Sequence, residues 1–425
     1  NNRCRHDNNR VNRRERNSNG KMRTSNLNRL LRHTAPHRFL LLCLPFTASC
    51  SEGSGTEPCA GLPTRTVLVY LAGDNNLEEI GRTPELLRQG WKDTGSKCLI
   101  YYDAPQAAPK LFALTIRHSD ASSVLETVEE YPEENSSSAG VFGRVVADVV
   151  RKYPSDSYGL IFASHGSGWL PCGALSDPTR TIGDDRTPGT TGGAREMEIT
   201  DFAAAIPDHQ FDFIIFEACL MSGIEVAYEL RNKTDYLLAS SAELLVPGYA
   251  PVYPTAFQYL FDTSLGVPQA LEKFAGSYFN YIDTRNGAYR SATQSIVYTR
   301  EMDALAILAG KTTGNTHGRW DDALLGKLQH FDRPGSYGDI PARPRYFDFG
   351  QYMAYLAPER QADLDALLRK TVVWKAATPE FMAGYNGFTI LTHSGLTTYI
   401  EQDEFPELNA AYKKTAWWKA THVQK

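Results

Sequence analysis

Apolar runs alternate with helical patterns between residues 64 and 245. Continuous apolar segments predict strands at 64–73, 97–105, 110–116, 158–166, 211–219 and 235–243. Apolar residues at helical spacing predict helices at 138–153, 199–207 and 221–232. Apolar strands separated by helices are typical of a parallel sheet that is covered on both faces, so the pattern predicts an α/β fold.

The pattern continues beyond residue 250 in a less regular form. It predicts helices at 268–283 and 363–376 and strands at 292–300 and 387–395. We therefore expect a core over residues 64–250 and an additional C-terminal α/β portion over residues 251–425.

The N-terminal segment has the pattern of an export signal. Residues 1–21 contain almost no apolar side chains, which indicates an over-extended start, and the first methionine is Met22. Residues 22–49 have a basic region, an eight-residue apolar run at 39–46 that is too short to span a bilayer, and small residues before Cys50. This arrangement resembles the cleavage site of bacterial lipoproteins, with Cys50 as the lipidated residue and 50–63 as a tether. An ordinary cleaved signal is the alternative.

Charge is distributed unevenly along the chain. Residues 1–49 hold eleven Lys/Arg and two Asp/Glu, so the rest carries a net charge of about −14, against −5 for the whole chain. An acidic surface repels phosphate backbones, and we expect no nucleic-acid partner.

Two candidate catalytic residues lie at the ends of neighbouring predicted strands. His165 follows the apolar run from residue 158, and Cys219 ends the next predicted strand, directly before a predicted helix. Ligands of parallel sheets bind beyond the carboxyl ends of the strands, and a helix N-terminus lowers the pKa of a thiol. The amides of Gly166 and Cys219 are candidate oxyanion donors. No CxxC pair is present, which disfavours a redox protein.

Several longer motifs resemble the clostripain family of cysteine peptidases, in the clan of caspases, legumains and gingipains. They are VYLAGDNNLE, YGLIFASHGSGW, FDFIIFEACLMSGIEVAYELRNKTDYLLASSAE, PGYAPVY and HSGLTTYI, spread over residues 64–420. The resemblance implies a caspase-like, mostly parallel sheet between helices, with Cys219 as nucleophile and His165 as general base. It implies a cysteine endopeptidase that acts on protein or peptide substrates. Together with the signal sequence and Cys50, it leads us to expect an exported enzyme that is lipid-anchored in a bacterial cell envelope, at the outer membrane or cell surface. A catalytically silent surface protein that binds peptides is the alternative, and the oligomeric state is not predicted.

The residues expected to contact substrate depart from the family pattern. Relatives that cleave after Arg or Lys commonly have Asp two residues before the nucleophile, whereas this chain has Glu217. The resemblance also assigns Ser241 and Glu243 to substrate binding. A basic P1 residue is expected, and a small or uncharged one stays open. The alternative for Glu217 is a carboxylate that caps a helix or pairs with a surface arginine.

No cofactor is expected. Some relatives depend on calcium, for which residues 72–79 offer oxygen atoms, but Asp-Asn-Asn after a strand is also an ordinary turn. His393 is expected to be structural. Residues 172–198 have the composition of a long loop, and members of the family mature by cleavage between the histidine and the cysteine. Arg180, Arg186 and Arg195 are the candidate cleavage points.

Overall fold

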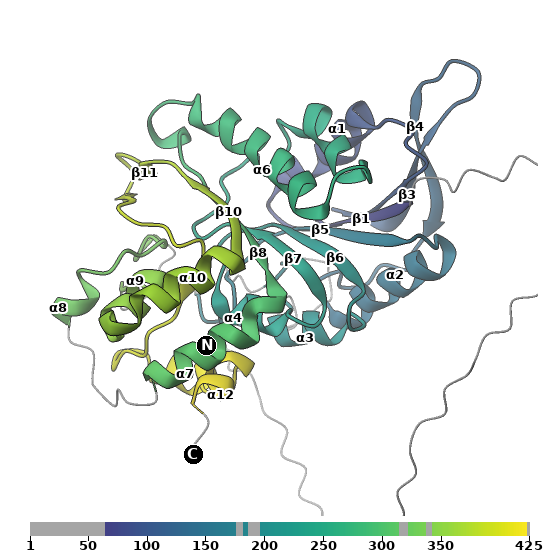
Figure 1. Cartoon of the computed structure of the whole chain (residues 1–425). Coiled ribbons are helices and arrows are strands. Elements are labelled where there is room, and N and C mark those ends of the chain that lie inside the picture. The colour runs from purple at the N-terminus through teal and green to yellow at the C-terminus, as the bar shows by residue number, and fades with distance from the viewer. Residues whose placement is uncertain (1–63, 176–181, 186–195, 314–321, 337–341, 423–425) are drawn as a thin grey trace, which may run out of the picture. The chain divides into compact units, whose positions relative to one another are not determined.

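The computed structural model describes residues 64–175, 182–185, 196–313, 322–336 and 342–422 (Figure 1). Within these ranges a nine-stranded sheet has the strand order β10-β8-β7-β6-β5-β1-β2-β3-β4. Its strands are β1 (Arg65–Ala72), β2 (Lys97–Ala104), β3 (Ala107–Ile116), β4 (Ser123–Glu130), β5 (Ser157–Ala163), β6 (Phe211–Glu217), β7 (Thr234–Ala239), β8 (Thr293–Tyr298) and β10 (Val372–Ala377). The α/β fold is therefore confirmed.

The centre of the sheet is parallel and both edges are antiparallel. Strands β7, β6, β5, β1 and β2 pair in parallel, while β10, β8, β3 and β4 join by antiparallel pairing. Every residue of β1 is buried, because alternate side chains enter the cores on opposite faces of the sheet. This explains why the central strands are continuous apolar runs.

Helices cover both faces of the sheet (Figure 1). One face packs against α1 (Thr83–Gly90), α5 (Tyr253–Ala256) and α6 (Val267–Asp283). The other face packs against α2 (Ala139–Lys152), α3 (Ile199–Ala204), α4 (Ile224–Glu229), α7 (Met302–Thr313), α9 (Phe349–Leu356), α10 (Gln361–Thr371), α11 (Pro406–Tyr412) and α12 (Ala416–Thr421). The short helix α8 (Asp322–Leu325) belongs to a smaller cluster. No helix in the described ranges is long and apolar enough to cross a membrane.

Residues beyond position 250 contribute to the same sheet through β8 and β10. They also form two small sheets, one of β9 (Phe347–Asp348) with β13 (Thr397–Thr398) and one of β11 (Glu380–Phe381) with β12 (Phe388–Thr389). The hairpin of β11 and β12 packs near the functional site described below.

Two predicted elements differ from the structure, and one strand was not predicted. The helix predicted at 363–376 ends at Thr371, and Val372–Ala377 forms β10 against β8. The strand predicted at 387–395 is limited to Phe388–Thr389. Strand β4 was not predicted because it is an edge strand, partly exposed and rich in acidic side chains, so it lacks a continuous apolar run.

Candidate active site

His165 and Cys219 lie at matching positions beyond two adjacent parallel strands. The last register pair of β5 and β6 is Ala163 with Glu217, and each candidate residue follows its strand by two positions. The contact continues past the strands, because the Ser164 amide donates to the Glu217 carbonyl at 3.3 Å. The strand register therefore brings the imidazole and the thiol together at the carboxyl ends of the central parallel strands.

A pocket with a volume of about 190 Å³ opens at these strand ends. Both His165 and Cys219 line it. The other lining residues come from the segments after β1, β5, β6 and β7: Leu77, Glu79, Ile80, Thr83, Ala163, Ser164, Glu217, Ala218, Glu243, Leu244, Leu245, Val246, Pro247 and Gly248. The lining is mostly apolar and includes three carboxylic acids.

The imidazole of His165 is held by a residue that the sequence interpretation did not assign. His165 Nε2 lies 2.7 Å from Asn76 Oδ1, in the segment after β1. An amide oxygen accepts hydrogen bonds, so Nε2 carries the proton in this pairing and Nδ1 is the basic nitrogen of the neutral ring. The signal in the sequence was the asparagine pair after a predicted strand, at the same sheet edge as the histidine.

The same segment forms a turn, and dependence on calcium stays untested. Asn75 Oδ1 accepts from the Leu77 amide at 2.8 Å, and Asn75 Nδ2 donates to the carbonyls of Ala72 and Asp184. The amide oxygens of Asn75 and Asn76 are therefore already engaged. In the part of the chain that the structure describes, no group of three or more His, Cys, Asp or Glu side chains has the geometry of a metal site.

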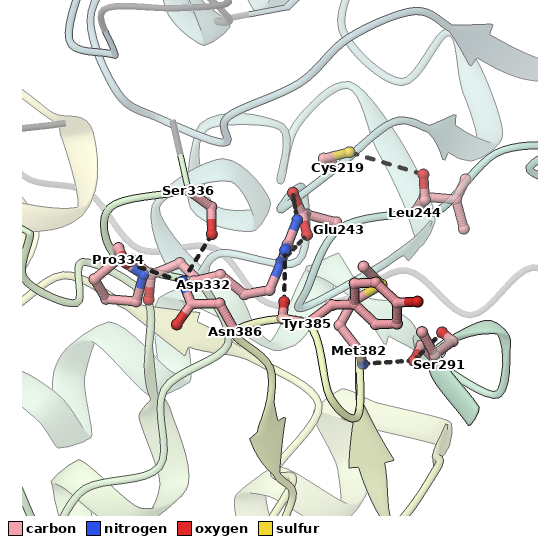
Figure 2. A network of polar contacts seen from close by, with 12 residues as sticks. Cys219, Glu243, Leu244, Ser291, Asp332, Pro334, Ser336, Met382, Tyr385 and Asn386 are labelled. Atoms are coloured by element: carbon pink, nitrogen blue, oxygen red, sulfur yellow. Dashed lines mark hydrogen bonds and ion pairs between the residues drawn. The ribbon is translucent and has the colours of Figure 1, made fainter. Parts of the chain in front are cut away.

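Cys219 does not sit at the start of a helix. Helix α4 begins at Ile224, five residues later, and the intervening segment turns sharply at Leu220, whose φ is +61°. The charge effect of a helix terminus is confined to the adjacent turn, so the expectation that α4 activates the thiol is wrong. Instead, the Cys219 Sγ faces the Leu244 carbonyl at 3.8 Å (Figure 2).

Gly166 contacts the backbone of the nucleophile. A Cβ at this position would lie 2.7 Å from the Cys219 carbonyl oxygen and 3.0 Å from the Ala218 Cβ. Only glycine permits this approach without displacement. The contact places the two amides assigned to the oxyanion hole on adjacent segments, and their role in catalysis stays a prediction.

Glu217 is partly buried in the wall of the pocket. Its carboxylate accepts from the Tyr249 amide at 2.7 Å and from the Tyr253 hydroxyl at 2.5 Å, and it pairs with no described arginine. Burial raises the pKa of Glu217 to about 7, although both hydrogen bonds oppose this shift. Gly248, with φ of +61°, lies against the carboxylate, since a Cβ there would be 2.4 Å from Oε1. Both the neutral and the charged form of the Glu217 carboxyl are therefore populated near pH 7.

The other two residues assigned to substrate binding differ from each other. Glu243 lines the pocket but forms an ion pair with Arg333. Ser241 is fully buried, and its hydroxyl lies 3.1 Å from His393 Nε2. Burial lowers the pKa of His393 to about 3, so its ring is neutral and structural. Ser241 therefore does not line the pocket in this structure.

Four further predicted residues lie outside the described part of the chain. They are the lipidation candidate Cys50 and the cleavage candidates Arg180, Arg186 and Arg195.

Comparison with known proteins agrees with this geometry. The model of the clostripain family matches residues 69–308. Clostripain of Hathewaya histolytica is 26% identical over 290 residues, which cover 61% of this chain and 52% of clostripain. The chain thus spans about half the length of that curated relative.

Solved structures resemble most of the chain. An inactive zymogen of a C11 protease from Parabacteroides distasonis is 29% identical with a TM-score of 0.69, covering 84% of this chain and 98% of that protein. A secreted C11 cysteine protease from Bacteroides thetaiotaomicron, solved with an irreversible peptide inhibitor, is 25% identical with the same score and the same coverage. The family model matches more than half of the residues, and the chain belongs to the clostripain family of cysteine peptidases.

Proposed function

We propose that this chain is an exported cysteine endopeptidase whose nucleophile is Cys219 and whose general acid-base is His165. The observation that carries the proposal is the shared pocket: both side chains line it, from matching positions on neighbouring parallel strands. A thiol and an imidazole that line one pocket are the pair of groups that nucleophilic acyl transfer by a cysteine needs.

The proposed reaction has two steps. His165 takes the proton of the Cys219 thiol, the thiolate attacks the scissile carbonyl carbon, and the amides of Gly166 and Cys219 stabilise the oxyanion. The C–N bond then breaks as His165 gives its proton to the leaving amine, which yields a thioester. Water, deprotonated by His165, attacks the thioester, and the C–S bond breaks to release the acid and regenerate the thiol. The proposal requires no cofactor, and unchanged activity in a calcium chelator would support that part of it.

Substitution of the two residues tests the proposal. Cys219→Ala is expected to abolish peptide hydrolysis, and His165→Ala to reduce it ~10²-fold to 10⁴-fold, the usual contribution of general acid-base catalysis. A thiol-directed peptide probe should label wild type at Cys219 alone. Full activity of Cys219→Ala would overturn the mechanism, and a folded wild type that binds peptide without cleavage or labelling would support the silent-binding alternative.

We propose a preference for a basic P1 residue, with Glu217 as its carboxylate partner. The support is the position of Glu217 in the pocket wall, two residues before the nucleophile. A library of peptides varied at P1 tests this directly. A preference for small or uncharged P1 residues would contradict it.

We propose that the chain is anchored to the cell envelope through a lipid on Cys50. The support is the sequence of residues 22–50 together with the relative that is a secreted protease. Cells that make the full chain should carry it in the membrane fraction, and Cys50→Ala should release it or leave the signal uncleaved. Soluble wild-type protein with an unmodified Cys50 would refute the anchor.

We propose that the chain is cleaved by its own activity after Arg180, Arg186 or Arg195. The support is the loop composition of residues 172–198 and their position between His165 and Cys219. Wild type should yield two associated fragments, whereas Cys219→Ala stays intact. Equal fragmentation of both proteins would indicate a contaminating protease, and an intact, fully active wild type would show that no cleavage is needed.

A further inference from the structure

The carboxylate of Glu243 is held in a two-point ion pair. Arg333 Nε lies 2.7 Å from Oε2 of Glu243, and Arg333 Nη2 lies 3.1 Å from Oε1. Both side chains are largely excluded from solvent, with 7% of the Glu243 side chain and 15% of the Arg333 side chain exposed. This fork is the strongest geometry for an arginine and a carboxylate, and it engages both oxygens.

Glu243 is next to the nucleophile. The carbonyl of the preceding residue, Ala242, accepts from the Leu220 amide at 2.9 Å, and the carbonyl of the following residue, Leu244, faces the Cys219 thiol at 3.8 Å. Figure 2 shows Glu243 beside Cys219 and Leu244 at the centre of this polar network. A change in the charge of Glu243 therefore changes the electrostatic potential in the pocket where the substrate is proposed to bind.

Arg333 is fixed by the hairpin of β11 and β12. Its Nη1 donates to the Tyr385 carbonyl at 3.2 Å, and Asn386 Nδ2 donates to Ser336 Oγ at 2.9 Å (Figure 2). An apolar cluster lies alongside these contacts, formed by Ala242, Phe331 and Phe381 with Leu245, Met382, Phe388 and Ile390. Arg333 is thus a positioned counterion and not a mobile surface arginine.

Glu217 and Glu243 consequently differ in character. Glu217 is held by an amide and a hydroxyl, which are uncharged. Glu243 is held by a guanidinium, which offsets its negative charge. The cation that a P1 arginine or lysine would bring is already supplied to Glu243 from within the chain.

We propose that Arg333 is a positioning residue that sets P1 specificity: it engages Glu243, withholds that carboxylate from the substrate, and leaves Glu217 to meet the P1 side chain. This inference rests on the proposed peptidase function. Removal of Arg333 takes away the cation that engages both oxygens of a buried carboxylate, which destabilises its charged form, and a cationic P1 side chain restores part of that stabilisation whereas an uncharged one does not.

Paired substrates separate this role from a structural one. We would measure kcat and KM at pH 8 for two peptides that differ only in P1, arginine in one and its uncharged analogue citrulline in the other. Arg333→Met should raise the arginine-to-citrulline ratio of kcat/KM roughly ten- to a hundredfold, the range expected for a hydrogen bond to a charged group, mainly through KM. Arg333→Lys keeps the cation and should stay near the wild-type ratio.

Substitution of Glu243 should change the arginine-to-citrulline ratio of kcat/KM in the opposite direction. Glu243→Gln removes the carboxylate that pairs with Arg333, which makes the pocket wall more positive, and should lower the ratio, while Glu243→Gln/Arg333→Met should return it to near the wild-type value. Arg300→Met is the matched control, because Arg300 forms an ion pair with Asp235 that is partly exposed and does not line the pocket. If Arg333→Met does not fold, the comparison of wild type, Glu243→Gln and the double variant still decides the matter.

Each outcome has one meaning. An equal fall for both substrates in Arg333→Met, or a ratio unchanged in both single variants, shows that the pair only supports the fold and overturns the inference. A wild type that neither cleaves the peptides nor reacts with the thiol-directed probe contradicts the proposed function instead.

Discussion

Asn76 Oδ1 and His165 Nε2 are 2.7 Å apart, so the amide of a loop after β1 orients the imidazole at the end of β5. The contact fixes one tautomer of the neutral ring, with the proton on Nε2. Asn76 offers the protonated ring a neutral acceptor, which stabilises the imidazolium less than a carboxylate at the same position would. Asn76 therefore acts on catalysis through His165.

Substitution of Asn76 should separate orientation from charge. Asn76→Ala removes the acceptor, and we expect kcat to fall about ten- to a hundredfold, part of the ~10²-fold to 10⁴-fold due to a positioned acid-base. Asn76→Asp replaces the amide with a carboxylate, which raises the pKa of His165 and moves the acid limb of the pH–rate profile to higher pH. Profiles of kcat/KM between pH 5 and 9 check both effects. Profiles identical to that of wild type would show that the contact has no role in catalysis.

Glu217 should make P1 selection depend on pH. Burial raises the pKa of this carboxyl to about 7, so it is mostly neutral at pH 6 and mostly ionised at pH 8. The arginine-to-citrulline ratio of kcat/KM should therefore increase as pH rises through about 7. The ratio cancels titration of the catalytic dyad, which affects both substrates equally. Glu217→Gln should lower the ratio and make it independent of pH, and a pH-dependent ratio in that variant would exclude Glu217 as the cause.

The sequence was sufficient to predict the centre of the fold and the position of His165 and Cys219 beyond adjacent parallel strands. Central parallel strands are buried on both faces, so they are continuous apolar runs with sharp ends, and His165 and Cys219 follow two such ends. Edge strands gave no such signal. Val372–Ala377 follows α10 directly and continues its helical apolar spacing, and only its pairing with β8 makes it a strand.

The partners of the site residues were not predictable, because each comes from a distant segment. Arg333 is 90 positions from Glu243 and belongs to no apolar pattern. Ser241 was assigned to substrate binding from the family resemblance, yet its hydroxyl lies within hydrogen-bond distance of His393, 152 positions later. Asn76 was read as part of a turn, which is correct for the backbone but misses the use of its side chain. Tertiary packing decides these pairings.

Gly166→Ala should impair catalysis with little loss of fold. The added methyl would lie 2.7 Å from the Cys219 carbonyl oxygen and 3.0 Å from the Ala218 Cβ, so the nucleophile segment must move. We expect kcat to fall at least about tenfold, since small displacements of a reacting group cost up to ~10²-fold. Gly140→Ala, whose Cβ meets no atom within 4 Å, is the control and should retain full activity. Unchanged kcat in Gly166→Ala would contradict the close approach.

Asp103 is a buried acid that does not line the pocket. Asp103, near the end of β2, is fully buried, and in the described structure neither of its carboxyl oxygens has a hydrogen-bond partner. Burial raises its pKa to about 8, and the charge of the nearby Asp185 adds to the shift. The folded chain therefore keeps a proton on Asp103 at neutral pH, whereas the unfolded chain loses it above about pH 4.

Asp103→Asn should stabilise the protein at pH 8. The folded pKa is raised, so wild-type stability is fully present below about pH 4 and decreases as pH rises to about 8, by roughly a few kcal/mol. An asparagine cannot ionise, so the variant should show a higher melting temperature at pH 8, a similar one at pH 4 and a flatter profile between them. Asp156→Asn is the control with opposite sign, because hydrogen bonds from the exposed Thr64 segment lower the pKa of Asp156 and the substitution removes their preference for the charged form. Melting curves of the three proteins at both pH values are the measurement, and a variant of Asp103 that melts lower than wild type at pH 8 would show that this carboxyl is ionised and stabilised in the fold.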